Sequence, residues 1–186
     1  LAVNLPDHDA GRAYTSFPPA EEAMLDRSQL GRKSGGGFGR MVKAEDGSKT
    51  KETFDLLSER WRPASEADLE GVPGGLGEVL FADTAPGRLA WEIFGGTLVY
   101  AAGLVPEIAD DIVNIDRAIR WGFNWVNGPF EMLDALGPDR VIAKLEAEGR
   151  EIPAMLQVLH DAGTGTFYRD GQFLERDGTW SEIPAE

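Results

Sequence analysis

Apolar residues recur at helical spacing through the second half of this 186-residue chain. Four isoleucines follow one another at intervals of four, three and four, so they share one stripe of a helix: Ile108, Ile112, Ile115 and Ile119. Pro106 suits the first turn because it lacks an N–H that this turn leaves unpaired, and Gly122 suits a left-handed cap. The pattern predicts a helix from Pro106 to about Trp121 whose charged residues face water: Asp110, Asp111, Asp116, Arg117 and Arg120.

Proline and glycine divide the neighbouring residues into shorter elements. Three further helices are predicted downstream: 129–137, 138–149 and a short one that starts near Pro153. Upstream, residues 88–103 are apolar nearly all round, which predicts the central and most buried helix. Arg88, Glu92 and the shortness of this stretch argue against a membrane span.

The residues before and after the helical region show different sequence patterns. Asp-Gly pairs at 170–171 and 177–178, set between short aromatic runs, predict a β-hairpin or meander. Residues 44–86 are polar and then rich in glycine and proline, which predicts a linker that crosses a surface. Three residues inside it are expected to anchor onto a neighbouring core: Phe54, Leu57 and Trp61. The predicted fold class is mainly α, with a small C-terminal β part.

Composition narrows the classes of function. The chain has 32 acidic and 18 basic residues, and the net charge of −14 repels a polyphosphate backbone, which argues against nucleic-acid binding. It contains no cysteine, which favours a reducing cytoplasm over an oxidising compartment. The first residue is Leu1, and the opening residues lack the basic start and apolar run of a signal peptide. We expect a cytoplasmic segment of a longer protein.

A glycine-rich run with basic residues invites comparison with phosphate-binding loops. Residues 31–40 read GRKSGGGFGR. In a Walker loop lysine and serine follow the glycines, whereas Lys33 and Ser34 precede them here, and a dinucleotide loop needs glycine where Arg40 stands. Neither pattern fits, so solvated surface is the favoured interpretation of this basic cluster.

No residue pattern supplies a catalytic, cofactor or metal site. His8 and His160 are the two histidines, and each is interpreted as a surface residue rather than a base. Asp110 and Asp111 are adjacent, diverge by about 100° on a helix, and cannot chelate one ion together. Core packing around a tight turn is favoured over an acyl-chain groove for four aromatic residues: Trp121, Phe123, Trp125 and Phe130.

Two stretches nevertheless resemble one enzyme family. Residues 105–137 resemble the C-terminal domain of 3-hydroxyacyl-CoA dehydrogenases, especially long bacterial enzymes that also carry an enoyl-CoA hydratase region. The matching residues are Asp116, Ala118, Gly122, Gly128, Pro129, Phe130 and Glu131. Residues 30–38, LGRKSGGGF, are similar to the tail that closes a copy of the same domain. Because this tail comes first, the resemblance implies a duplicated form: residues 1–43 as the tail of a first repeat, 44–86 as a linker, 87–163 as a second repeat, and 164–186 as a β-hairpin tail.

The resemblance implies NAD-dependent oxidation of a 3-hydroxyacyl-CoA in fatty-acid β-oxidation, and a helical fold like the C-terminal domain of 6-phosphogluconate dehydrogenase. The NAD-binding half is not among these residues, so we expect no cofactor here and NAD in the intact enzyme. The family's asparagine at the start of the long helix aligns near Gly87, which has no side chain, and no catalytic residue is carried over. The implied partners are the NAD-binding domain, an acyl-CoA that Arg32 and Lys33 could contact, and a second subunit in a homodimer.

Two alternatives to a dehydrogenase C-terminal domain stay open. One is a non-enzymatic assembly or docking module whose aromatic residues bind a protein partner. The other is a different oxidoreductase with a similar helical domain, of the 6-phosphogluconate type, which ranks lowest because such proteins lack the combined GRKSGGGF and GPFE stretches. The reading frame upstream of Leu1 distinguishes these hypotheses.

Overall fold

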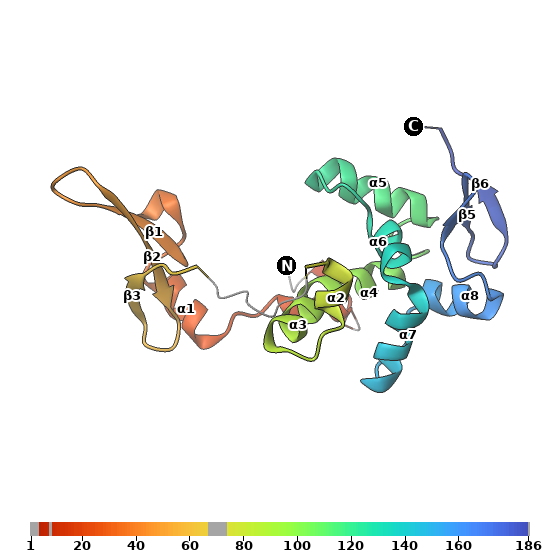
Figure 1. The fold of residues 1–186 in the computed structure, drawn as a ribbon, viewed down its shortest axis with the longest axis horizontal. Coiled ribbons are helices and arrows are strands. Elements are labelled where there is room, and N and C mark those ends of the chain that lie inside the picture. Colours follow the sequence, from red (N-terminus) through yellow and green to blue (C-terminus); the bar gives the residue numbers. More distant parts are fainter. Residues whose placement is uncertain (1–3, 8, 67–73, 186) are drawn as a thin grey trace. The chain divides into compact units, whose positions relative to one another are not determined.

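The computed structural model describes residues 4–7, 9–66 and 74–185, and the chain divides into two compact units, residues 1–70 and 71–186 (Figure 1). The first unit has short helical segments and three strands: η2 (Ala10–Tyr14), α1 (Pro19–Asp26), η3 (Arg32–Ser34), β1 (Gly39–Lys43), β2 (Lys49–Asp55) and β3 (Arg60–Pro63). The strands form an antiparallel sheet in the order β1-β2-β3.

Residues 44–86, for which the sequence predicted a linker, contain regular secondary structure. β2 and β3 lie within that range, and helix α2 (Leu76–Leu80) follows. Phe54 pairs with Trp61 across the strands, their rings meet edge to face with centroids 5.3 Å apart, and Phe54 is buried. The anchoring role predicted for Leu57 is wrong, because Leu57 lies in the turn between β2 and β3 and is fully exposed.

The second unit is mainly helical. Its remaining elements are α3 (Ala85–Ala90), the π-helical segment η4 (Trp91–Gly95), α4 (Gly96–Gly103), α5 (Ile112–Phe123), α6 (Pro129–Leu136), α7 (Pro138–Ala147), α8 (Ala154–Ala162), and strands β4 (Tyr168–Arg169), β5 (Gln172–Leu174) and β6 (Trp180–Glu182). The three strands form an antiparallel meander, with Asp170 and Gly171 in the tight turn. The predicted fold class, mainly α with a small C-terminal β part, is confirmed.

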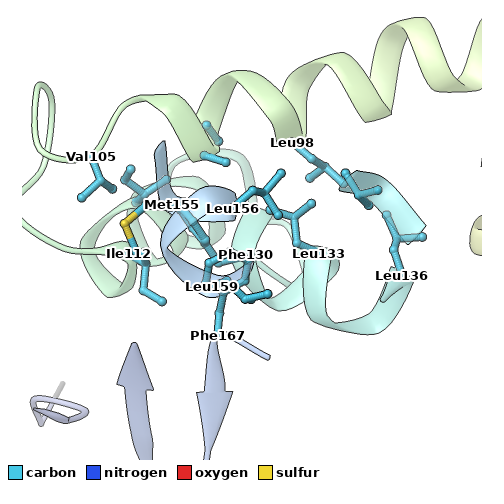
Figure 2. Packing of buried hydrophobic residues seen from close by; sticks show 14 of the residues in the cluster. Leu98, Val105, Ile112, Phe130, Leu133, Leu136, Met155, Leu156, Leu159 and Phe167 are labelled. Atoms are coloured by element: carbon cyan, nitrogen blue, oxygen red, sulfur yellow. The ribbon is translucent and has the colours of Figure 1, made fainter. Parts of the chain in front are cut away.

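One apolar core holds the second unit together. Side chains from α4, α5, α6 and α8 meet in it, and Phe167, just before the meander, packs edge to face on Phe130 with ring centroids 5.0 Å apart (Figure 2). Burying each such side chain stabilises the fold by roughly 1.5–3 kcal/mol. The helices predicted from Pro129, from Pro138 and near Pro153 are confirmed, and Gly137 and Gly149 have the positive φ expected after a helix.

The boundaries predicted for the isoleucine helix are wrong at both ends. Helix α5 begins at Ile112, because the Asp111 side chain accepts a hydrogen bond from the Asn114 N–H and caps it. Pro106 lies in the preceding turn, so Ile108 falls outside the helix and is 69% exposed. At the other end, Asn124 rather than Gly122 takes the left-handed conformation.

Residues 85–103 form a nearly continuous helical segment, but its apolar surface is not buried all round. Trp91 and Leu98 face the core, whereas Leu89 and Ile93 are more than half exposed. The core-packing expectation is likewise wrong for Trp121 and Phe123, which are exposed at the end of α5, and right for Phe130. Among the described helices, none is long and apolar enough to cross a membrane.

Candidate functional site

Asp116, Gly128, Pro129, Phe130 and Glu131 of the family motif converge at the beginning of α6, whereas Ala118 and Gly122 are exposed on α5. Gly128 is the N-cap of this helix, and Pro129 occupies its first position. The Asp116 carboxylate, contributed by α5, accepts hydrogen bonds from the N–H groups of Phe130 at 2.8 Å and Glu131 at 3.1 Å. The Tyr168 hydroxyl donates a third, at 2.9 Å. Asp116 is 3% exposed, so the prediction that it faces water is wrong.

The geometry follows from what a helix N-terminus needs. The first N–H groups of a helix have no partner within it, and Gly128 has no side chain with which to supply one. The Asp116 carboxylate does so from a neighbouring helix, and the partial positive charge of the helix end favours the anion. The Glu131 side chain reaches back to accept from the Gly128 N–H at 2.7 Å, and also lies 3.5 Å from Arg120. We call Asp116, Gly128, Phe130, Glu131 and Tyr168 the Asp116 cluster.

A second carboxylate ties the C-terminal meander to the same helix. Asp134, on α6, accepts hydrogen bonds from the N–H groups of Phe167 at 2.7 Å and Tyr168 at 2.9 Å, and from the Thr166 hydroxyl at 2.7 Å. Tyr168 therefore contacts Asp134 through its backbone and Asp116 through its side chain. Sequence reasoning missed Asp134, Thr166 and Tyr168, because no local pattern shows that a strand returns to a helix more than thirty residues earlier.

Burial is the largest influence on the pKa values of Asp116, Asp134 and Tyr168. It raises the pKa of Asp116 to about 6, even though the hydrogen bonds from Phe130, Tyr168 and Glu131 favour the ionised form. Burial also raises the pKa of Asp134. The pKa of Tyr168 rises above its ordinary value, first because of burial and then because of the adjacent Asp116 carboxylate. The tyrosine therefore stays a hydrogen-bond donor at neutral pH.

The Asp116 cluster joins α5, the beginning of α6 and the first strand of the meander, and Asp116, Glu131 and Tyr168 also line a pocket of about 370 Å³. Its side chains have partners within the cluster or in the neighbouring Arg120, and no buried polar side-chain atom of the described residues lacks a hydrogen-bond partner. An ideal Cβ at Gly128 would lie 2.3 Å from Asp116 Cβ, so glycine is required for the two helices to approach. Gly122, by contrast, is exposed and has no atom near an added Cβ.

The basic loop of the first unit does not form a phosphate cradle. Gly31 and Gly36 exchange N–H···O hydrogen bonds at 2.8 and 3.0 Å, and the Ser34 hydroxyl accepts from the Leu30 N–H. An added Cβ at Gly36 would lie 2.9 Å from the Trp61 ring. The glycines therefore serve close packing of the loop on itself and on Trp61. Arg32 and Lys33 are exposed, and their contact with coenzyme A stays a prediction.

The other candidate residues do not assemble into a site. His160 is exposed near the end of α8, as expected, while His8 lies outside the described residues. Asp111 caps α5, and Asp110 is exposed beside it. Within the described parts of the chain, no group of three or more histidine, aspartate or glutamate side chains could hold a metal ion.

Gly87 occupies a position where no side chain fits. It lies in the first turn of α3 and is buried, and an ideal Cβ would lie 2.2 Å from the Ala82 carbonyl oxygen and 2.8 Å from that of Val79. The chain around it would have to move before any asparagine could be accommodated. In this conformation, residue 87 therefore has to be glycine.

We expect Gly87→Asn to lower the free energy of unfolding by about 3 kcal/mol, because overpacking against backbone atoms cannot be relieved by a rotamer change. The matched control is Gly103→Ala at the end of α4, where an added Cβ meets no atom within 4 Å. Urea denaturation followed by circular dichroism measures both. Equal midpoints for the two variants would show that α3 tolerates a side chain at 87.

Comparison with known proteins places these observations in a family. The chain is 37% identical to a protein of Bacillus subtilis (strain 168) named "Probable 3-hydroxyacyl-CoA dehydrogenase", over 90% of this chain. It is 32% and 30% identical to proteins of Rickettsia felis and Rickettsia prowazekii, each named "Putative fatty acid oxidation complex trifunctional enzyme", over 75% and 67% of this chain. This sequence is a segment of the kind found in 3-hydroxyacyl-CoA dehydrogenases.

The match covers only part of those proteins. The chain spans 22% of the B. subtilis relative and 19% and 17% of the two Rickettsia relatives. No protein-family model and no solved structure matches it. The resemblance to the C-terminal domain of 3-hydroxyacyl-CoA dehydrogenases is confirmed, whereas the repeat boundaries and the likeness to 6-phosphogluconate dehydrogenase stay predictions.

Proposed function

We propose that this chain is the substrate-side and domain-packing part of an NAD-dependent 3-hydroxyacyl-CoA dehydrogenase of fatty-acid β-oxidation, in which the chemistry takes place elsewhere. The proposal rests on how the residues of the family motif are used in this structure. Four of its residues, Asp116, Gly128, Phe130 and Glu131, belong to the Asp116 cluster, and Gly87, near which the family's asparagine is expected, is enclosed by backbone oxygens. A helical platform fits these features.

In the intact protein, an NAD-binding domain would hold the cofactor and act on the acyl-CoA. The second repeat could replace a partner subunit, or the segment could support a homodimer. Cytoplasmic location remains our expectation from the absence of cysteine. The alternative, a non-enzymatic docking module, is supported by the exposure of Trp121 and Phe123.

The test compares the 186-residue chain with the full-length protein encoded by its gene. Oxidation of NADH with acetoacetyl-CoA, followed by absorbance, should be readily measured for the full-length protein and stay at background for the chain alone. Turnover by a verified 186-residue preparation would contradict the claim that catalysis lies elsewhere. A full-length protein with no turnover and no dinucleotide-binding sequence would favour the docking module.

A further inference from the structure

The three-stranded sheet of the first unit (Figure 1) has two faces of different character. Residues paired across antiparallel strands point to the same side of the sheet, so the register assigns each side chain to a face. Phe54 and Trp61 belong to a packed face, where an added Cβ at Gly36 would lie 2.9 Å from the Trp61 ring and the Arg27 guanidinium lies 5.3 Å from the Phe54 ring centroid. The register places five exposed basic residues, which we call the basic face, on the opposite side: Lys43, Lys49, Lys51, Arg60 and Arg62.

Positive charge is concentrated on this face although the chain is acidic. The face holds five of the 18 basic residues, whereas Asp55 is the one acidic residue of the three strands that shares it. Asp55 lies 3.4 Å from Arg62, and no ion pair among the described residues reaches the other four basic side chains. Glu45 and Asp46, in the turn between β1 and β2, offset only part of the charge. The basic face is therefore locally positive on a chain whose net charge is −14.

Strand pairing also brings like charges together at the end of the β1–β2 hairpin. Lys43 is paired directly with Lys49, and Lys51 follows two residues later on the same face. Like charges directly opposite each other destabilise an antiparallel pair. A charge of either sign guards an exposed strand against aggregation, and glutamate at one of the two paired positions would replace the repulsion with attraction. The repulsive pair therefore favours a role in binding an anion.

The proposed function supplies an anion whose charge fits this face. Coenzyme A esters carry a diphosphate and a phosphate monoester, and the monoester alone has about 1.5–2 negative charges at neutral pH. Lysine binds phosphate as a point charge, so an exposed sheet face can hold such groups without a pocket. The net charge of the chain would otherwise repel the ligand. We infer that the basic face binds the phosphate groups of the acyl-CoA substrate. This inference rests on the proposed function.

The test is an NMR titration of the isotope-labelled 186-residue chain with coenzyme A at low salt. The amides of residues 40–43, 49–53 and 60–62 should shift, and added salt should reverse the shifts because it screens exposed charges. The double variant Lys49→Glu, Lys51→Glu should bind roughly tenfold more weakly or worse, because two charge-assisted contacts to phosphate are lost. This variant should stay folded, since both residues are exposed and Lys49→Glu replaces a repulsive pair with an attractive one.

A matched double variant separates the basic face from the net charge of the chain. Arg88→Glu with Arg176→Glu changes the net charge equally, from exposed positions in the second unit, and should bind coenzyme A as the wild type does. In the full-length protein encoded by the gene, Lys49→Glu with Lys51→Glu should raise KM for acetoacetyl-CoA and leave kcat unchanged. The second-unit pair should leave KM unchanged.

Several results would overturn the inference. Coenzyme A that leaves the amides of the three strands unmoved would show that the basic face binds no phosphate. Shifts confined to residues 31–35, and lost in Arg32→Glu with Lys33→Glu, would place the ligand on the glycine-rich loop. Binding to phosphatidylserine vesicles that coenzyme A does not displace would assign the face to a lipid surface. A full-length protein that binds coenzyme A but lacks NADH-linked turnover would instead contradict the proposed function, because the titration detects binding without turnover.

Discussion

Asp116→Ala should lower the free energy of unfolding of this chain by about 3 to 5 kcal/mol, because it leaves buried donors without an acceptor. The N–H groups of Phe130 and Glu131 and the Tyr168 hydroxyl all donate to this carboxylate. Phe130 is fully buried, so water cannot replace the lost acceptor at its N–H without opening the core. The loss is a large share of the roughly 5–15 kcal/mol that stabilises a typical domain.

Two other variants separate this effect from a general loss of negative charge. Asp110→Ala removes an exposed carboxylate six residues earlier and should change the stability by less than about 0.5 kcal/mol. Asp116→Asn keeps the shape and one acceptor oxygen, so it should lie between Asp116→Ala and the wild type. Urea denaturation near neutral pH, monitored by circular dichroism, gives all three values. If Asp116→Ala were as stable as Asp110→Ala, the cluster would not hold α5 and α6 together.

The sequence predicted the periodic helices well, because a buried stripe and its flanking proline or glycine are local signals. α6, α7 and α8 begin close to the predicted prolines. The start of α5 was misplaced because two start signals, Pro106 and Asp111, compete within six residues. The side chain of Asp111 prevails through its hydrogen bond to the Asn114 N–H.

The first sheet escaped prediction for a different reason. β1 is exposed along most of its length, and so are the first three residues of β2, and the side chains of these strands show no regular alternation between apolar and polar residues. What holds the strands is the pair Phe54 and Trp61, together with Arg40, whose guanidinium lies 4.2 Å from the Trp61 ring centroid. Such contacts join residues that are distant in sequence, and periodicity does not report them.

The candidate site was half predictable. The family resemblance identified Asp116, Gly128 and Glu131 as motif residues. The pattern of charged residues, however, predicted that Asp116 lies on the solvent-exposed face of its helix. An aspartate looks exposed when only its own helix is considered, and its donors come from residues 14, 15 and 52 positions away. The role of Asp134 could not be predicted for the same reason, because its side chain bonds to residues that all lie beyond residue 165.

The two motif glycines should respond in opposite ways to alanine. Gly128→Ala should cost about 3 kcal/mol or more, because overpacking of a rigid site is relieved only by moving backbone. The added Cβ would lie 2.3 Å from Asp116 Cβ and Cγ, and three hydrogen bonds hold that carboxylate in place.

Gly122→Ala should instead stabilise the chain by about 0.5 to 1 kcal/mol, the usual difference between glycine and alanine inside a helix. Gly122 lies within α5, and an added Cβ there meets no atom within 4 Å. Thermal melts of the two variants beside the wild type should therefore move in opposite directions. Equal destabilisation of both variants would contradict the prediction. It would show that α5 requires glycine at position 122, beside the exposed residues Trp121 and Phe123.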